Sequence, residues 1–297
     1  MQPLDTGVET LEVRGEGGDV LLRSVVSLLL AISKGADWGW GSGTTLGLFA
    51  LAAVALLAWG FYEMRTRDPL IDLRTTARPR VLLTNAASIL IGVGMYAFML
   101  IAPQLLQFPE ATGYGLGQSM LARGLWMAPG GVMMMIVSLG GRLINARGPK
   151  TALVLGALVI SAGYGLALPL MGSAWGLMIV GIVVNSGVGL AYGAMPALIM
   201  SAVPLSETAA ANGFNTLMRS LGTTIGSAVI GVVLAQMTTT LGGCTLASEN
   251  GFRTGLLIGC GVALVSAAVA SLIPAVRTGA GDSATEETVA HEVATGA

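Results

Sequence analysis

The chain carries few side chains that could perform acid–base, nucleophilic or metal chemistry. Its 297 residues include one histidine, His291, and two cysteines, Cys244 and Cys260, without Cys-x-x-Cys or Cys/His spacing. Neither a structural zinc site nor a disulfide framework is therefore indicated. Catalysis at a membrane needs convergent acids, histidine or cysteine, and the acidic stretch Asp68–Asp72 has no metal-ligand spacing. We expect neither an enzyme nor a cofactor.

Polar or polarisable side chains inside or beside long apolar segments are the remaining candidates, and their chemistry is the binding of an organic solute. The candidates for a substrate cavity are Tyr96, Gln104, Gln107, Met134, Asn185, Tyr192, Asn215 and Arg219. A charge within an apolar span is costly unless it faces a cavity or a partner. Arg219 therefore predicts a substrate or gate contact, and the simpler interpretation is that it snorkels to the headgroups. Asn185 needs hydrogen-bond partners, either in a cavity or on a neighbouring helix.

Three further groups keep two interpretations each. Gln104 and Gln107 favour a cap at the membrane interface over a place in the cavity. The run Met133–Met135 offers a soft surface suited to varied apolar ligands, although consecutive methionines point around a helix and favour packing against lipid or helices. Arg142 and Arg147 set the topology of their loop in the simpler interpretation and latch two domains in the sharper one.

Composition indicates the elements that hold these residues. The chain is 54% hydrophobic and 10% charged, whereas soluble proteins carry about 25% charged residues. A bilayer core requires about 20 apolar residues per helix, and backbone groups in lipid must pair within their own segment. We expect an all-α polytopic membrane protein with about eight transmembrane helices. The expected spans are 20–34, 44–64, 82–104, 119–141, 150–171, 175–200, 208–236 and 253–276.

Two basic loops predict the orientation of these spans. The first loop carries five arginines, and the loop after the fourth span carries three basic residues: Arg65, Arg67, Arg74, Arg78 and Arg80, then Arg142, Arg147 and Lys150. Positively charged loops stay in the cytoplasm, so eight spans place both termini there, in a multi-pass protein of the cell membrane. If the short first span, which contains Arg23, does not insert, the N-terminus lies outside. No basic patch indicates nucleic acid.

Four stretches resemble the major facilitator superfamily, in its branch of fourteen-helix drug:proton antiporters. The cytoplasmic loop resembles the family signature through Gly141, Arg142, Asn145, Arg147, Gly148 and Lys150. The stretches 34–42, 67–74 and 211–226 resemble, in order, the outer end of the family's seventh helix, the segment before its ninth and its thirteenth helix. The resemblance implies helices seven to fourteen only, which is half of the fold plus two linker helices.

The resemblance also implies a division of the chain. We expect a disordered polar leader at 1–19, two linker helices with a basic loop at 20–80, a six-helix transporter bundle at 81–277 and a disordered cytoplasmic tail at 278–297. The family's first six-helix domain, which holds the carboxylates of proton coupling, has no counterpart here. Glu207, at a helix start, is the acid nearest to an apolar span, and Asn145 replaces the signature's aspartate.

We therefore expect a transporter of the major facilitator type. It is expected to export amphipathic organic compounds by ion-coupled antiport, and to be incomplete as encoded. Its partners are membrane lipid, a small organic substrate and a separately encoded N-terminal half of six helices. The alternative is a non-transporting membrane remnant or a partner subunit of a split transporter.

Overall fold

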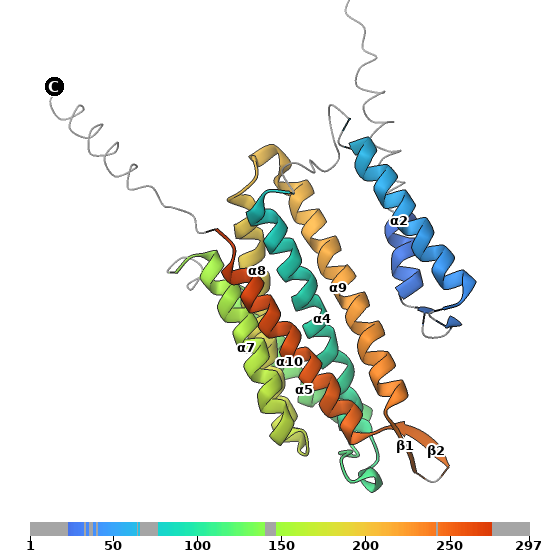
Figure 1. Ribbon diagram of the computed structural model, residues 1–297. Coiled ribbons are helices and arrows are strands. Elements are labelled where there is room, and N and C mark those ends of the chain that lie inside the picture. The colour runs from blue at the N-terminus through green and yellow to red at the C-terminus, as the bar shows by residue number, and fades with distance from the viewer. Residues whose placement is uncertain are drawn as a thin grey trace, which may run out of the picture.

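The computed structural model describes residues 23–32, 34–35, 38–39, 41–63, 65, 77–139, 147–241 and 243–274. The expected leader and tail, the run 67–74 and the loop residues Gly141, Arg142 and Asn145 lie outside the described residues. Within them the chain is helical apart from loops and one small hairpin (Figure 1).

Seven helices of the described part are long and apolar enough to cross a membrane. They are α2 (Gly43–Glu63), α4 (Pro79–Gln107), α5 (Met120–Leu139), α7 (Pro149–Leu170), α8 (Ala174–Met200), α9 (Thr208–Gln236) and α10 (Glu249–Ser271). Two 3-10 turns, η1 (Glu110–Thr112) and η2 (Leu205–Glu207), precede α5 and α9. The first expected span contains the short apolar helix Arg23–Ile32. Ten residues rise about 15 Å, which is half of a hydrocarbon core of about 30 Å. The all-α membrane architecture is confirmed.

Helix starts follow from local chemistry. Ser173 and Ser248 precede α8 and α10, and their hydroxyls accept hydrogen bonds from the Gly176 and Gly251 amides at 3.0 and 3.2 Å. A side-chain acceptor there satisfies an amide that has no partner in the first turn. Helices α4 and α7 instead begin with a proline, whose fixed φ suits the first helical position and which lacks the amide that would be unpaired.

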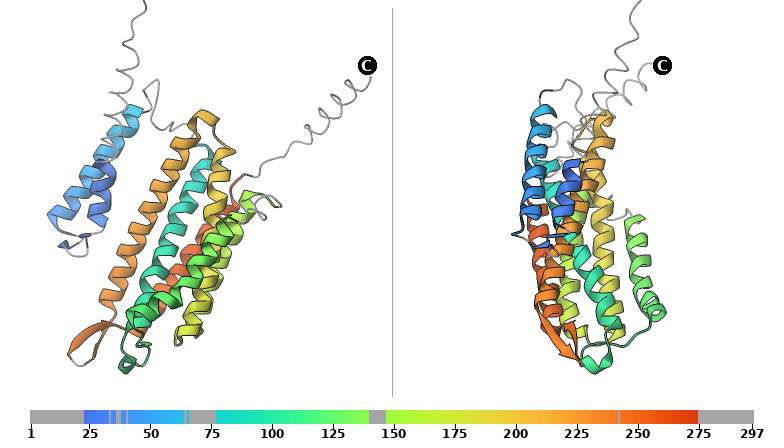
Figure 2. Two further views of the ribbon diagram at one scale, coloured as in Figure 1. Left: turned by 180° about the vertical axis from the view of Figure 1, so that it is seen from behind. Right: turned by 90° about the vertical axis from the view of Figure 1, so that its right-hand side faces the viewer.

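Helices α4 and α8 hold the centre of a six-helix bundle. Helix α7 packs on α8, α10 packs on α7 and α4, α5 packs on α8, and α9 packs on α4 (Figures 1 and 2). The α7–α8 crossing is close because glycine faces glycine. A Cβ atom on Gly187 would lie 2.6 Å from the Gly156 oxygen, and one on Gly156 would lie 2.8 Å from the Gly187 oxygen. Small residues permit such contact between membrane helices, where lipid is as apolar as the helices themselves.

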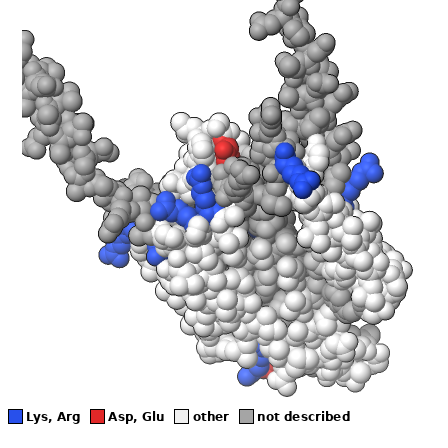
Figure 3. Space-filling view, turned by 45° about the horizontal axis from the view of Figure 1, so that its top comes forward, with Lys and Arg blue, Asp and Glu red and all other residues white. Residues whose placement is uncertain are grey.

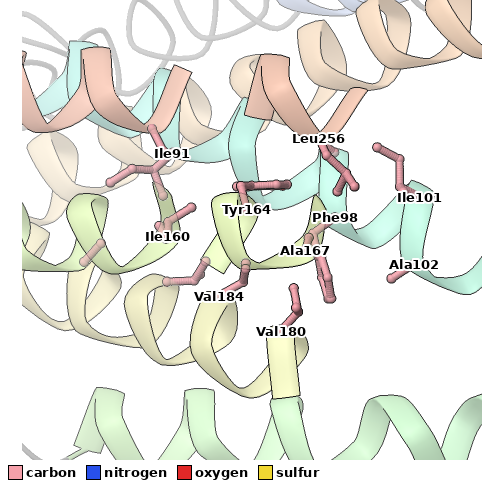
Figure 4. Close-up of a cluster of buried hydrophobic side chains, with 14 of the residues drawn as sticks. Ile91, Phe98, Ile101, Ala102, Ile160, Tyr164, Ala167, Val180, Val184 and Leu256 are labelled. Atoms are coloured by element: carbon pink, nitrogen blue, oxygen red, sulfur yellow. The ribbon is translucent and has the colours of Figure 1, made fainter. Parts of the chain in front are cut away.

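Tyr164 fills the middle of the bundle. Its ring is fully buried among side chains of α4, α7, α8 and α10, as Figure 4 shows for Phe98, Ile160, Val184 and Leu256. Phe98 meets it edge to face, with ring centroids 6.4 Å apart. The hydroxyl donates to the Gly94 carbonyl of α4. The buried hydroxyl is thus paired, as an apolar interior requires, and α7 is tied to α4.

A two-stranded hairpin joins α9 to α10, which the sequence did not lead us to expect. Strands β1 (Thr238–Leu241) and β2 (Cys244–Ala247) pair antiparallel. The Tyr114 hydroxyl, from the loop between α4 and α5, donates to the Ala247 carbonyl. Burial, and secondarily the charge of Glu249, raise the pKa of Tyr114 above its usual value, so the phenol stays protonated and remains a donor.

Helix α2 and the short helix Arg23–Ile32 lie together beside α9 (Figure 2). Trp59 of α2 is buried, and it packs with Val25 of the short helix, Leu56 of α2 and Phe214 of α9. The face of α2 away from this contact is apolar and exposed, including Leu51, Val54 and Leu57. An apolar surface of this kind suits lipid tails.

Candidate functional site

The candidate cavity residues come from four of the six bundle helices. Tyr96, Gln104 and Gln107 lie on α4, Met134 on α5, Asn185 and Tyr192 on α8, and Asn215 and Arg219 on α9. Helices α7 and α10 pack against each other and carry none of them. We call the surface shared by α4, α5, α8 and α9 the four-helix face.

The charged centre of this face is a stacked pair, Arg219 on α9 and Tyr192 on α8. The guanidinium carbon of Arg219 lies 4.4 Å from the centre of the Tyr192 ring, within range of a cation–π interaction. The Tyr192 hydroxyl donates to the Met95 sulfur at 2.9 Å. Both side chains are half-buried. Within the described residues, the guanidinium makes no hydrogen bond and no ion pair, so its N–H donors are available.

Asn215 lies between α9 and α4 and is 3% exposed. Its amide nitrogen donates to the Asn85 side-chain oxygen at 2.9 Å and to the Ser88 hydroxyl at 2.6 Å. Ser88 in turn donates to the Thr84 carbonyl at 2.9 Å. This polar chain is enclosed by helices, and it fixes α9 against α4 one turn before Arg219.

Asn185 and Met134 contribute to the contact between α8 and α5. The Asn185 amide donates to the Gly181 carbonyl of its own helix at 2.8 Å. A Cβ atom on Gly130 of α5 would lie 2.9 Å from that amide nitrogen. Met134 is half-buried against the core, and its backbone oxygen approaches Gly189 of α8. Both residues thus support a close helix crossing.

Gln104 and Gln107 lie at the end of α4, away from the stacked pair. The side-chain oxygen of Gln107 accepts a hydrogen bond from Arg123 of α5 at 3.0 Å, and both groups are at the surface. Gln104 is half-buried, and its backbone carbonyl accepts the Phe108 amide beyond the helix. This end of α4 therefore has polar contacts suited to a membrane interface.

Tyr96 lines a cavity of about 460 Å³ between the bundle and the short helix Arg23–Ile32. The short helix supplies an apolar wall, and α9 supplies hydroxyl groups. The lining residues are Val26, Leu29, Leu30, Tyr96, Thr223, Thr224 and Ser227. The sequence analysis missed the three hydroxyl residues, because serine and threonine are ordinary in membrane helices. The available signal was their spacing: Thr223 and Ser227 follow Arg219 by four and eight residues, on one helix face.

Basic residues gather at one end of the bundle, where α4, α7 and α9 begin (Figure 3, with Lys and Arg in blue). Arg78 donates to the Ala202 carbonyl at 2.7 Å, and Arg80 to the Ser201 carbonyl at 3.3 Å. These bonds fix the start of α4 to the turn between α8 and α9. Of the loop signature, Arg147, Gly148 and Lys150 are described, and they lie at the start of α7.

In the sequence of the described helices, acidic residues occur only at helix ends, at positions Glu63, Glu110, Glu207 and Glu249. Glu249 pairs with Arg253 at 2.7 Å. The described residues contain no cluster of three or more histidine, cysteine or acidic side chains that could hold a metal ion.

Comparison with known proteins gives a single family. Residues 20–227 match the model described as Major Facilitator Superfamily. The chain is 29% identical over 221 residues to the tetracycline resistance determinant of Streptomyces rimosus, covering 72% of this chain and 61% of that protein. It is 26% identical over 218 residues to the multidrug transporter protein MdtP of Bacillus subtilis, covering 72% and 39%. It is 28% identical over 218 residues to the multidrug resistance protein Stp of Mycobacterium tuberculosis, covering 73% and 40%. The matches thus span 39% to 61% of these relatives' lengths.

Proposed function

Because this chain belongs to the Major Facilitator Superfamily, we propose that it supplies the C-terminal portion of an efflux transporter for amphipathic organic compounds. The observation that carries the proposal is the stacked pair of Arg219 and Tyr192, a half-buried cation on an aromatic ring within a bundle of membrane-spanning helices. Tyr96 lines a separate cavity between this bundle and the short helix Arg23–Ile32. Substrate sites of such transporters lie near the bilayer midplane, between two bundles that rock against each other. The names of the relatives, which refer to tetracycline resistance, multidrug transport and multidrug resistance, support the efflux of organic compounds.

The proposed division of the chain follows the sequence. Residues 81–277 form the transporter bundle, and residues 20–80 contribute the linker helices, which contact the bundle through Phe214. The proposed orientation is cytoplasmic for the end where Arg78, Arg80, Arg147 and Lys150 gather, since basic residues favour that side. Both termini then lie in the cytoplasm, provided that residues 20–34 complete a span.

The opposing six-helix half is proposed as a separate partner, and ion coupling as its contribution. Proton-coupled transport needs a titratable group in the pathway, and the described helices carry acids only at their ends. Antiport by this chain alone is therefore not expected. The alternative, a membrane remnant or a partner subunit that does not itself transport, fits the same lack of acids in the described spans.

The test uses inverted membrane vesicles with an imposed proton gradient. Vesicles containing this chain alone are expected not to take up tetracycline above the level of empty vesicles. Production together with the part of Bacillus subtilis MdtP that lies outside the matched 39% is expected to give gradient-dependent uptake. Uptake by the chain alone would contradict the proposed need for a second half. The absence of uptake with any six-helix half would favour the remnant.

A further inference from the structure

The geometry points to Arg219 as the group that selects the substrate's charge: the four-helix face binds amphipathic organic anions, with the acidic group at Arg219 and the apolar body in the adjacent cavity. This inference rests on the proposed function and names its substrate class.

The guanidinium of Arg219 lies deep within the length of the bundle. Arg219 lies eleven residues after Thr208, the first residue of α9, which is about 16 Å along the helix axis. Tyr192 lies eight residues before Met200, the last residue of α8, which is about 12 Å from the same end of the bundle. The guanidinium lies on the Tyr192 ring at 4.4 Å. It is therefore directed sideways to α8 at this depth, and not along α9 to the headgroups.

The positive charge of Arg219 is only partly paired by the described residues. The tyrosine ring covers one face of the guanidinium, but the N–H donors project from its edge. Within the described residues, no acceptor meets those donors. A planar carboxylate accepts two parallel N–H bonds from an arginine edge, so an acidic group beside the Tyr192 ring satisfies both the charge and the donors.

The cavity lined by Tyr96 begins one helical turn beyond Arg219 along α9. Thr223 lines it and lies one helical turn beyond Arg219 on the same face. The hydroxyls of Thr223 and Thr224 donate back to the Ser220 carbonyl at 2.8 and 3.0 Å, so their hydrogens are already paired within α9. Val26, Leu29 and Leu30 form the apolar wall. The cavity has a volume of about 460 Å³ and is largely open to its surroundings.

The charge around the cavity favours an anion over a cation. Among the described residues that line the cavity there is neither an aspartate nor a glutamate, and the described helices carry acids only at their ends. On this chain, the described residues around the cavity offer a cationic substrate no opposite charge, whereas Arg219 offers an anion a charged partner. The source of the anion can be a solute or the phosphate of an anionic lipid; the proposal commits to the solute.

The experiment measures the binding of two matched fluorescent probes to the full chain in phosphatidylcholine nanodiscs. Dansylaminoundecanoic acid carries a carboxylate, and its methyl ester has the same apolar body without the charge. The acid is expected to bind about tenfold more tightly than the ester. In R219Q the acid is expected to weaken to the affinity of the ester, with ester binding unchanged. R219K is expected to keep part of the preference, because it retains the charge without the planar donor edge.

R253Q is the matched control. Arg253 is exposed and pairs with Glu249 at the start of α10, next to the hairpin. It is expected to bind both probes as the unchanged chain does. The inference is overturned if acid and ester bind equally, or if R219Q still binds the acid more tightly than the ester. Binding of the ester in either case leaves the proposed function standing. If neither probe binds, both fall. Loss of acid binding when phosphatidylglycerol replaces part of the lipid would assign the site to a lipid phosphate and also overturn the inference. Ester binding by R219Q shows that this variant is folded.

Discussion

The crossing of α7 and α8 gives the sharpest prediction about stability, through Gly187→Ala. A Cβ atom at position 187 would lie 2.6 Å from the Gly156 oxygen and 2.9 Å from the Ile160 backbone nitrogen. Ordinary contact begins at 3.4 Å, so the two backbones must separate by about 0.8 Å. Both atoms belong to the backbone of a helix, which cannot rotate away as a side chain can. Overpacking of this kind costs about 1–3 kcal/mol.

The control is Gly165→Ala on α7, where a Cβ atom would meet nothing within 4 Å. Alanine is favoured over glycine in a helix by about 1 kcal/mol, so the control is expected to be neutral or slightly stabilising. Both variants share this gain, so Gly187→Ala is expected to be less stable than Gly165→Ala by about 1–3 kcal/mol. Each variant is unfolded by titration with sodium dodecyl sulfate, followed by far-ultraviolet circular dichroism. A Gly187→Ala variant as stable as Gly165→Ala would refute the close crossing.

Two further changes test polar contacts. Asn215→Ala is expected to destabilise the bundle by about 1–3 kcal/mol in the same titration, whereas Asn212→Ala, whose amide bonds its own helix at 3.0 Å, is expected to be near neutral; equal effects would count against the α4–α9 hydrogen bonds. Tyr114→Phe removes the donor to Ala247 and is expected to cost about 1 kcal/mol. Because the pKa of Tyr114 is raised in the folded chain from a usual 10.0, its contribution is complete below pH 10 and is lost as the pH rises through the folded pKa. The melting temperature is measured below and above pH 10 for the unchanged chain and for Tyr114→Phe. The drop between the two pH values should be larger for the unchanged chain, and equal drops in both proteins would contradict this.

Helix positions were the most predictable part of the fold, because apolar length decides them. The expected span 208–236 coincides with α9 (Thr208–Gln236). The expected span 253–276 is shifted: α10 begins at Glu249, since the Ser248 hydroxyl caps its first turn. The hairpin was missed because its two short strands, TTTL and CTLA, do not alternate strictly between apolar and polar residues. Its signal was Gly242-Gly243, a pair that suits a two-residue hairpin turn.

The candidate site was less predictable, because a sequence gives the residue type and not the partner across the bundle. Asn215 and Arg219 are one turn apart on α9, yet Asn215 is enclosed against α4 and Arg219 stacks on α8. The direction in which each points depends on the rotation of α9, which the contacts of Gly222 and Gly226 with α4 determine. The hydroxyls of Thr223 and Ser227 gained meaning only from the short helix packed opposite them.

The most direct test of the account is labelling of single cysteines with a membrane-impermeant maleimide on intact cells. The native Cys244 is exposed in the hairpin, and Arg147 is exposed near the start of α7, at the opposite end of the bundle. With Cys260 replaced by alanine, Cys244 is expected to react from outside, while Arg147→Cys in a chain lacking Cys244 is expected to react only after the cells are permeabilised. Labelling of the Arg147→Cys variant in intact cells would contradict a bundle that spans the membrane with its basic end in the cytoplasm.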